Sequence, residues 1–176
     1  MAEQVTLWET ELKEAGVVEV STLRASNSDE TARVILDLIG KKDREFLIVL
    51  SLDKNNYITG VHELAKGTSD HVVTTIAAVI RFACLTGSHR IIIGHNHPMG
   101  NVLNVSEEDI ELTLNISRAC CLHNIELLDS IIVDYQDRYL SICQIIEINE
   151  KIGDGKALTE EKLLAIIEEV NNAKQE

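Results

Sequence analysis

The sequence predicts a mixed α/β fold, in which helices cover a sheet. Apolar runs typical of strands alternate along the chain with segments whose apolar residues recur at helical spacing. The chain has 176 residues, of which 45% are hydrophobic, and this is enough for one domain with a sizeable core. It is too short for a TIM barrel, which typically needs about 200 residues or more.

The N-terminal part of the chain predicts a helix, a strand and a second helix. Apolar residues at helical spacing predict the first helix over residues 5–16, and a short extended run follows at residues 17–23. The second helix is expected over residues 26–40. Polar N-cap candidates begin that segment, an apolar stripe runs along it, and Gly40 stands where a helix C-terminus favours glycine.

The middle of the chain predicts a hairpin, a helix and a further strand. Residues 46–52 are almost continuously apolar, a polar turn follows them, and residues 57–64 resume an extended pattern. A helix is expected over residues 68–87, which end in a glycine. The next strand is expected over residues 90–93.

The C-terminal part predicts a helix and two strands, followed by a tail. The helix is expected over residues 106–123, and the strands over residues 125–134 and 139–148. We therefore place the domain at residues 1–148. Residues 149–176 are expected to form a linker and a C-terminal amphipathic helix.

The apolar stripe of this last helix needs a partner. It consists of Leu163, Ile166, Ile167 and Val170. Either the same domain or a second copy must cover such a stripe, so a homodimer through the C-terminal helix is one expectation.

The charge and the cysteines restrict partners and compartment. The chain carries 29 acidic and 16 basic residues, a formal net charge of −13, which disfavours direct binding of nucleic acid and of anionic membranes. No apolar run approaches the roughly 20 residues of a membrane helix. The four cysteines form no Cys-x-x-Cys motif, and the N-terminus has no leader pattern. We therefore expect a cytoplasmic protein.

Two histidines mark the segment with the clearest chemistry. An apolar strand that ends at Gly94 is followed by His95 and His97, two residues apart. In extended backbone both imidazoles point to the same face of the sheet. Two nitrogen ligands side by side are half of a catalytic zinc site, which typically has three protein ligands and leaves one position to water.

Asp109 is the candidate for the third ligand. The segment Ser106-Glu107-Glu108-Asp109 is typical of a helix N-terminus, and the preceding loop can fold this first turn over the strand end. The alternative is that Asp109 only forms a capping box with Ser106. The nearby histidine pair is what favours the metal ligand.

Glu63 is the candidate for the general base. It shares one face of its strand with Tyr57, Thr59 and Val61. This face is partly apolar and is expected to point inward. A zinc hydrolase needs such a carboxylate to take a proton from water. The alternative is an exposed glutamate at the end of a strand.

These residues resemble the JAMM (MPN+) metalloprotease-like domain, and most closely its bacterial RadC branch. The resemblance runs from about residue 26 to residue 142 and rests on the segments FLIVLSLDKNN, ELAKGT, GHNHP, the Ser-x-x-Asp motif and ELLDSIIV. It implies a three-layer α/β/α architecture with a mixed central sheet, the JAB/MPN or cytidine-deaminase-like fold. The helix-hairpin-helix region that precedes this domain in longer RadC proteins has no counterpart in the sequence, so a stand-alone domain is expected.

The resemblance also implies roles for the residues singled out above. His95, His97 and Asp109 would bind one zinc per chain, Glu63 would be the general acid/base, and Ser106 would help to hold the oxyanion. The implied function is a zinc-dependent hydrolase that cleaves a peptide or isopeptide bond in a peptide or protein substrate. The alternatives are a catalytically idle MPN-like interaction or dimerisation domain and a RadC-type accessory protein of DNA repair.

Overall fold

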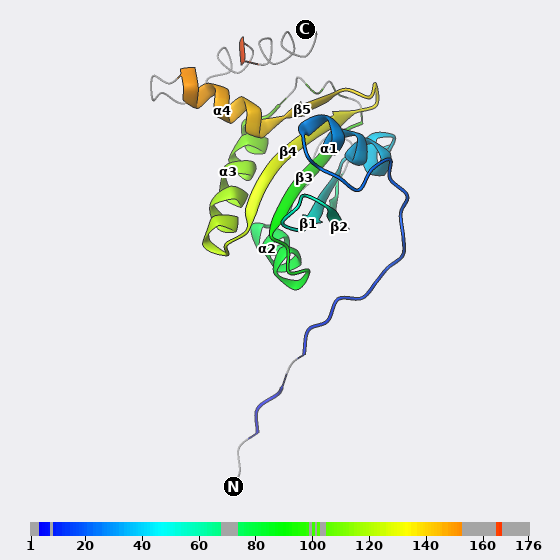
Figure 1. Ribbon diagram of the computed structural model, residues 1–176, viewed down its shortest axis with the longest axis vertical. Coiled ribbons are helices and arrows are strands. Elements are labelled where there is room, and N and C mark those ends of the chain that lie inside the picture. The colour runs from blue at the N-terminus through cyan, green and yellow to red at the C-terminus, as the bar shows by residue number, and fades with distance from the viewer. Residues whose placement is uncertain are drawn as a thin grey trace.

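A five-stranded mixed sheet forms the centre of the molecule (Figure 1). The computed structural model describes residues 4–7, 9–67, 74–98, 100, 102, 105–152 and 165–166. The strand order is β2-β1-β3-β4-β5, and only β3 and β4 pair in parallel. The strands are β1 (Phe46–Leu52), β2 (Ile58–Lys66), β3 (Arg90–His97), β4 (Glu126–Asp134) and β5 (Tyr139–Ser141).

Helices cover both faces of the sheet and give the three layers that the family resemblance implies. The helices of the described ranges are α1 (Ser28–Ile35), which continues into a π-helical turn η1 (Leu36–Gly40), α2 (Ile76–Leu85), α3 (Glu107–Leu122) and α4 (Ile142–Ile152). The α1–η1 segment packs on one face, against β1, β3 and β4. On the other face lie α2 and α3, with α4 beside α3 over β4 and β5.

Alternation along the strands divides the core between these two faces. On β1, Ile48 and Leu50 pack toward α1, whereas Leu47 and Val49 pack toward α2 and α3. All seven residues of β1 are buried. This explains the almost continuous apolar run in the sequence, because a central strand covered on both faces needs apolar side chains at every position.

Most of the expected elements occur near their expected positions, with three corrections. Residues 4–7 and 9–20 form no helix and run as an extended segment. The strand expected over residues 17–23 does not form either; the next residue, Arg24, makes an isolated bridge to Tyr57. The strand expected over residues 139–148 ends at Ser141, where α4 begins. The side chain of Ser141 accepts a hydrogen bond from the backbone N–H of Gln144, as an N-cap does.

The C-terminal expectations lie mostly outside the described residues. Helix α4 runs to Ile152 and so crosses the boundary expected at residue 148. Of the apolar stripe expected in the last helix, only Ile166 is described; it is buried against α4 and β5. None of the helices in the described ranges is long and apolar enough to cross a membrane.

Candidate metal centre

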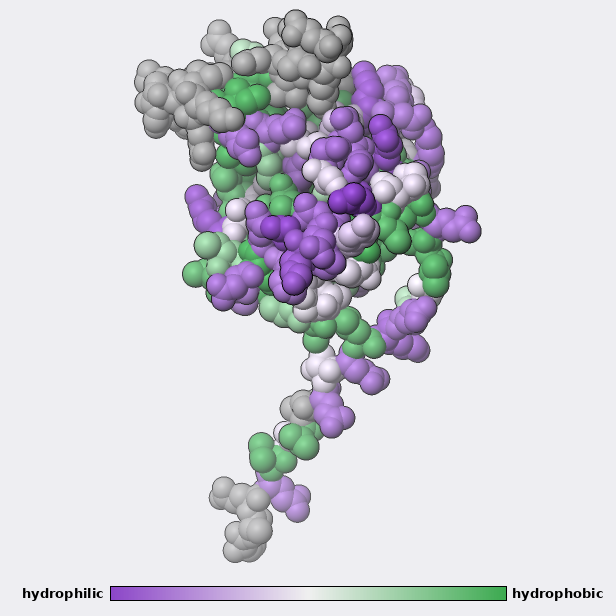
Figure 2. Space-filling model, viewed as in Figure 1, coloured by the Kyte–Doolittle hydropathy of each residue, from purple (hydrophilic) through white to green (hydrophobic). Residues whose placement is uncertain are grey.

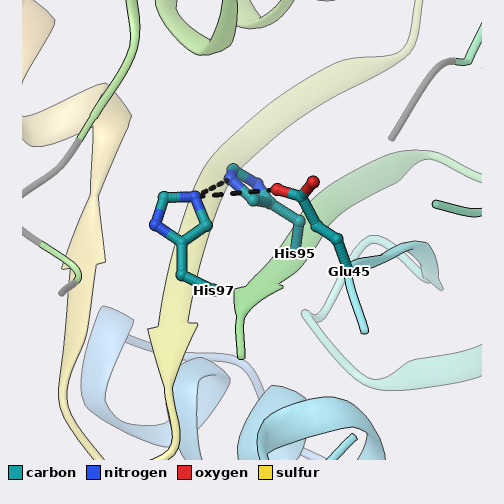
Figure 3. A group of neighbouring side chains, drawn as sticks. All are labelled: Glu45, His95 and His97. Atoms are coloured by element: carbon teal, nitrogen blue, oxygen red, sulfur yellow. Dashed lines mark hydrogen bonds and ion pairs between the residues drawn. The ribbon is translucent and has the colours of Figure 1, made fainter. Parts of the chain in front are cut away.

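His95 and His97 lie together at the C-terminal end of β3, on the face covered by α3 (Figure 3). Their Nε2 atoms are 3.2 Å apart, and their ring centroids are 5.0 Å apart. Both belong to the strand, which is longer than the sequence predicts and brings both side chains to one face. His95 is almost fully buried, and His97 is slightly more exposed.

Asp109 reaches His95 from the first turn of α3. Its Oδ2 accepts hydrogen bonds from the backbone N–H of Ser106 at 3.1 Å and from the Ser106 hydroxyl at 2.7 Å. The same hydroxyl accepts from the backbone N–H of Asp109, which completes a capping box. The other oxygen, Oδ1, lies 3.4 Å from His95 Nε2. Asp109 therefore caps the helix with one oxygen and presents the other to His95.

Ser106 has no proton to offer elsewhere in this arrangement. A hydroxyl has one donor, and that of Ser106 points to Asp109. In this structure Ser106 therefore orients the carboxylate of Asp109.

Glu45 is the acidic residue that sequence analysis missed. It precedes β1, is buried, and its Oε1 lies 3.8 Å from His97 Nε2. One oxygen of Glu45 and one nitrogen of each histidine lie within 4.8 Å of one another. The signal in the sequence is its place directly before an apolar strand. Because β1 and β3 are antiparallel and Leu47 pairs with His95, residue 45 comes opposite His97.

Asn96 fixes the backbone on both sides of Glu45. This fully buried side chain accepts a hydrogen bond from the backbone N–H of Phe46 at 2.8 Å and donates one to the backbone C=O of Arg44 at 3.0 Å. From the β2 side, the backbone N–H of Gly67 donates to the C=O of Glu45 at 2.8 Å. Glu45 is thereby held between its two neighbouring strands.

Glu63 lies away from this group. It is exposed on the edge strand β2, where its register partner on β1 is Ile48. Ile48 and Val61 both pack toward α1, so Glu63 points to that side of the sheet. His95 instead pairs with Leu47, which packs toward α2 and α3. The structure therefore places Glu63 on the opposite face of the sheet from the histidines.

Two separations among the donor atoms match those of a tetrahedral metal ion, whereas the group whose ligand atoms all lie within 4.8 Å of one another is Glu45, His95 and His97. Ligand atoms about 2.1 Å from a tetrahedral zinc ion lie about 3.4 Å from one another. The separations of His95 Nε2 from His97 Nε2 and from Asp109 Oδ1, 3.2 and 3.4 Å, match this value. Burial lowers the pKa of His95 to about 4, against the opposing effect of Asp109, so this imidazole is neutral at pH 7, as a metal ligand must be.

Several curated proteins are similar in sequence to this chain. A UPF0758 protein of Carboxydothermus hydrogenoformans is 33% identical over 116 residues, which cover 66% of this chain and 50% of that protein. One of Streptococcus pyogenes serotype M3 is 35% identical over 112 residues, with coverage of 64% and 49%. One of Thermosynechococcus vestitus is 33% identical over 123 residues, with coverage of 69% and 48%. The chain thus spans about half the length of these curated relatives.

The family model described as RadC-like JAB domain matches residues 25–147. This range begins just before α1 and extends into α4, so it includes every strand of the sheet and each of the residues gathered at the end of β3. The chain belongs to the RadC-like JAB domain family.

Proposed function

We propose that the protein is a metal-dependent hydrolase of the JAMM type, which cleaves a peptide or isopeptide bond. His95, His97 and Asp109 would hold one zinc ion per chain, and Glu45 replaces Glu63 as the general base. The observation that carries the proposal is the spacing of the donor atoms, since the two short separations at His95 Nε2 are those of neighbouring ligands.

The bound zinc would polarise the substrate carbonyl and lower the pKa of a water molecule toward 7. Glu45 would act as the general base. Its carboxylate would accept a proton from the attacking water and return it to the leaving amine. Its place at 3.8 Å from His97, within a buried site, supports this role. Asn96 would act as a positioning residue, since it fixes the backbone on both sides of Glu45.

A pocket near the C-terminal end of β3 offers room for a substrate. Its volume is about 480 Å³, and Lys41, Lys42, Pro98 and Tyr135 line it. Pro98 directly follows His97 in the chain. A peptide or protein segment suits such a pocket, and the net charge of −13 still disfavours nucleic acid as the substrate.

Metal analysis tests the binding half of the proposal. We expect about one zinc per chain in the purified protein and a loss of that zinc in His97→Ala, because the variant removes one of three ligands. His89→Ala is the matched control, since His89 lies before β3 and away from the donor atoms. A wild-type protein that binds no zinc at neutral pH would refute the assignment.

Cleavage of a proteome-derived peptide mixture, read by mass spectrometry, tests the catalytic half. Glu45→Gln should retain zinc and lose cleavage, because it removes the proton acceptor and keeps the shape of the side chain. Glu63→Gln, the matched control on the exposed edge strand, should retain both. If Glu63→Gln alone abolishes cleavage, the base is Glu63. If the zinc-loaded wild type cleaves nothing, a catalytically idle interaction domain becomes the better description.

A further inference from the structure

The N-terminal arm (residues 4–7 and 9–22) exposes apolar side chains that no other described part of the chain covers. It runs away from the body of the molecule as an extended segment (Figure 1). Val5, Leu7 and Val17 are 96%, 89% and 88% exposed. Apolar and polar residues alternate along it on the molecular surface (Figure 2). Large apolar side chains gathered on one extended segment mark an interaction surface.

Directly after the arm, Leu23 and Arg24 contact the start of β2. The arm itself leaves the strand at this point. Ile58 donates its backbone N–H to the C=O of Leu23 at 2.8 Å, and Arg24 bridges Tyr57 in antiparallel register. Earlier in the arm, the backbone N–H of Ser21 donates to Asp37 Oδ2 at 2.7 Å. This bond holds the arm against η1 and so keeps it away from the edge of the sheet.

An apolar groove of about 870 Å³ lies between the arm and the body. Its floor is formed by Ile58 and Val61 of β2, Phe82 and Leu85 of α2, and Leu38 of η1. Its other wall is the arm of the same chain, which contributes residues 12–18 and 20. Here β2 is the edge strand of the sheet, and along residues 60–66 no described strand pairs with its outer side. The groove therefore combines an apolar floor with an unpaired strand edge, which is the arrangement that accepts an added strand.

The length of the arm argues against closure onto its own chain alone. If the register of the Arg24–Tyr57 bridge continued, Val20 would lie opposite Val61, and Ala15 would lie opposite Lys66, where β2 ends. Residues 4–14 would then extend past the end of the strand. Val5, Leu7 and Leu12 would then stay in solvent, because no described surface of the same chain reaches them.

We infer that two copies of the chain exchange their N-terminal arms, each arm binding in the groove and along the β2 edge of the other copy. Each copy carries one arm and one groove, so a symmetric pair satisfies both surfaces at once and closes without further growth. The inference does not depend on metal or on hydrolysis. It uses a different edge of the molecule from the candidate metal centre.

Light scattering on the full chain tests this inference, across a wide range of concentration and with a reductant present because Cys84 and Cys121 are exposed. We expect a mass of twice the 19.6 kDa chain. Leu7→Asp and Val17→Asp should weaken the dimer about tenfold or more, because each places a charge in a buried apolar contact. Leu122→Asp is the matched control: that leucine is 83% exposed at the end of α3, away from the groove, and its variant should dimerise normally.

Hydrogen exchange localises the contact. Amides along residues 60–66 should exchange more slowly in the wild-type dimer than in Leu7→Asp, and circular dichroism should show that both are folded. A monomer at every concentration would overturn the inference, and so would a dimer that neither arm variant weakens. Protection of β2 in a monomer would also overturn it, because that result means that the arm closes on its own chain.

Discussion

Asn96 links β1 to β3 at the point where their backbone pairing ends. The ladder stops at Leu47 and His95, and beyond it the side chain of Asn96 takes the place of a backbone partner for Phe46 and Arg44. Asn96 is fully buried. The side chain of Asn96 therefore sets the distance between Glu45 and the two histidines, His95 and His97, that flank Asn96 in the sequence.

Asn96→Ala should lower the free energy of unfolding by about 1–3 kcal/mol, because it leaves the buried N–H of Phe46 without an acceptor. Chemical denaturation measures this loss. If Asn96 positions Glu45, the variant should also keep its zinc and lose cleavage at unchanged peptide specificity. Asn115→Ala, which removes a side chain bonded to Arg118 on α3, is the control and should change neither quantity.

The site could be predicted from the sequence only where its residues follow local spacing. His95, His97 and Asp109 are close in sequence, and strand alternation and a capping box bring them together. Glu45 joins them only through the antiparallel register of β1 and β3, which no local pattern reveals. The partly apolar strand face favours Glu63 in the sequence, but on an edge strand that face opens to solvent near its end.

At the scale of the elements, Gly94 sets how closely α1 packs on β3. A Cβ at this position would lie 2.9 Å from Cδ1 and Cγ1 of Ile35, which is itself fully buried. These are not flexible ends that can move into solvent. Close packing against Ile35 therefore explains why a glycine stands directly before the candidate metal ligands.

Gly94→Ala should cost about 1–3 kcal/mol of unfolding free energy through overpacking against α1. Thermal or chemical denaturation measures the cost. Combined with Ile35→Ala, which removes the clashing atoms, Gly94→Ala should cost much less than it does alone, as a double-mutant cycle shows directly. Additive effects of the two substitutions would mean that the strain lies elsewhere.

Most elements could be predicted from periodicity, and two of the failures have clear physical causes. Over residues 139–148 the isoleucines fit both an extended run and the i, i+3 spacing of Ile142 and Ile145, and burial against β4 and β5 decides for the helix. In residues 5–16 helical spacing is present, but no described surface of the same chain covers the stripe. A short helix without a partner is only marginally stable.

At the scale of the whole molecule, Asp129 joins elements that are far apart in the sequence. This buried carboxylate on β4 accepts hydrogen bonds from the Ser28 hydroxyl of α1 at 3.0 Å and from the Ser141 hydroxyl of β5 at 2.7 Å. The backbone N–H of Ser130 donates to it at 2.8 Å. Burial raises the pKa of Asp129 all the same, although these hydrogen bonds oppose the shift.

The raised pKa of Asp129 predicts how stability depends on pH. A carboxyl with a higher pKa in the folded state holds its proton more tightly there, so its contribution to stability is complete below the ordinary pKa of 3.8 and is lost as the pH rises through the raised value. The unfolding free energy of the wild type minus that of Asp129→Asn should therefore fall from acid to neutral pH. Denaturant titrations at several pH values measure the difference. Asp43→Asn should give the opposite slope, because the hydrogen bond and charge of Arg44 lower the pKa of Asp43. A flat or rising difference for Asp129→Asn would mean that the hydrogen bonds to the carboxylate outweigh its burial.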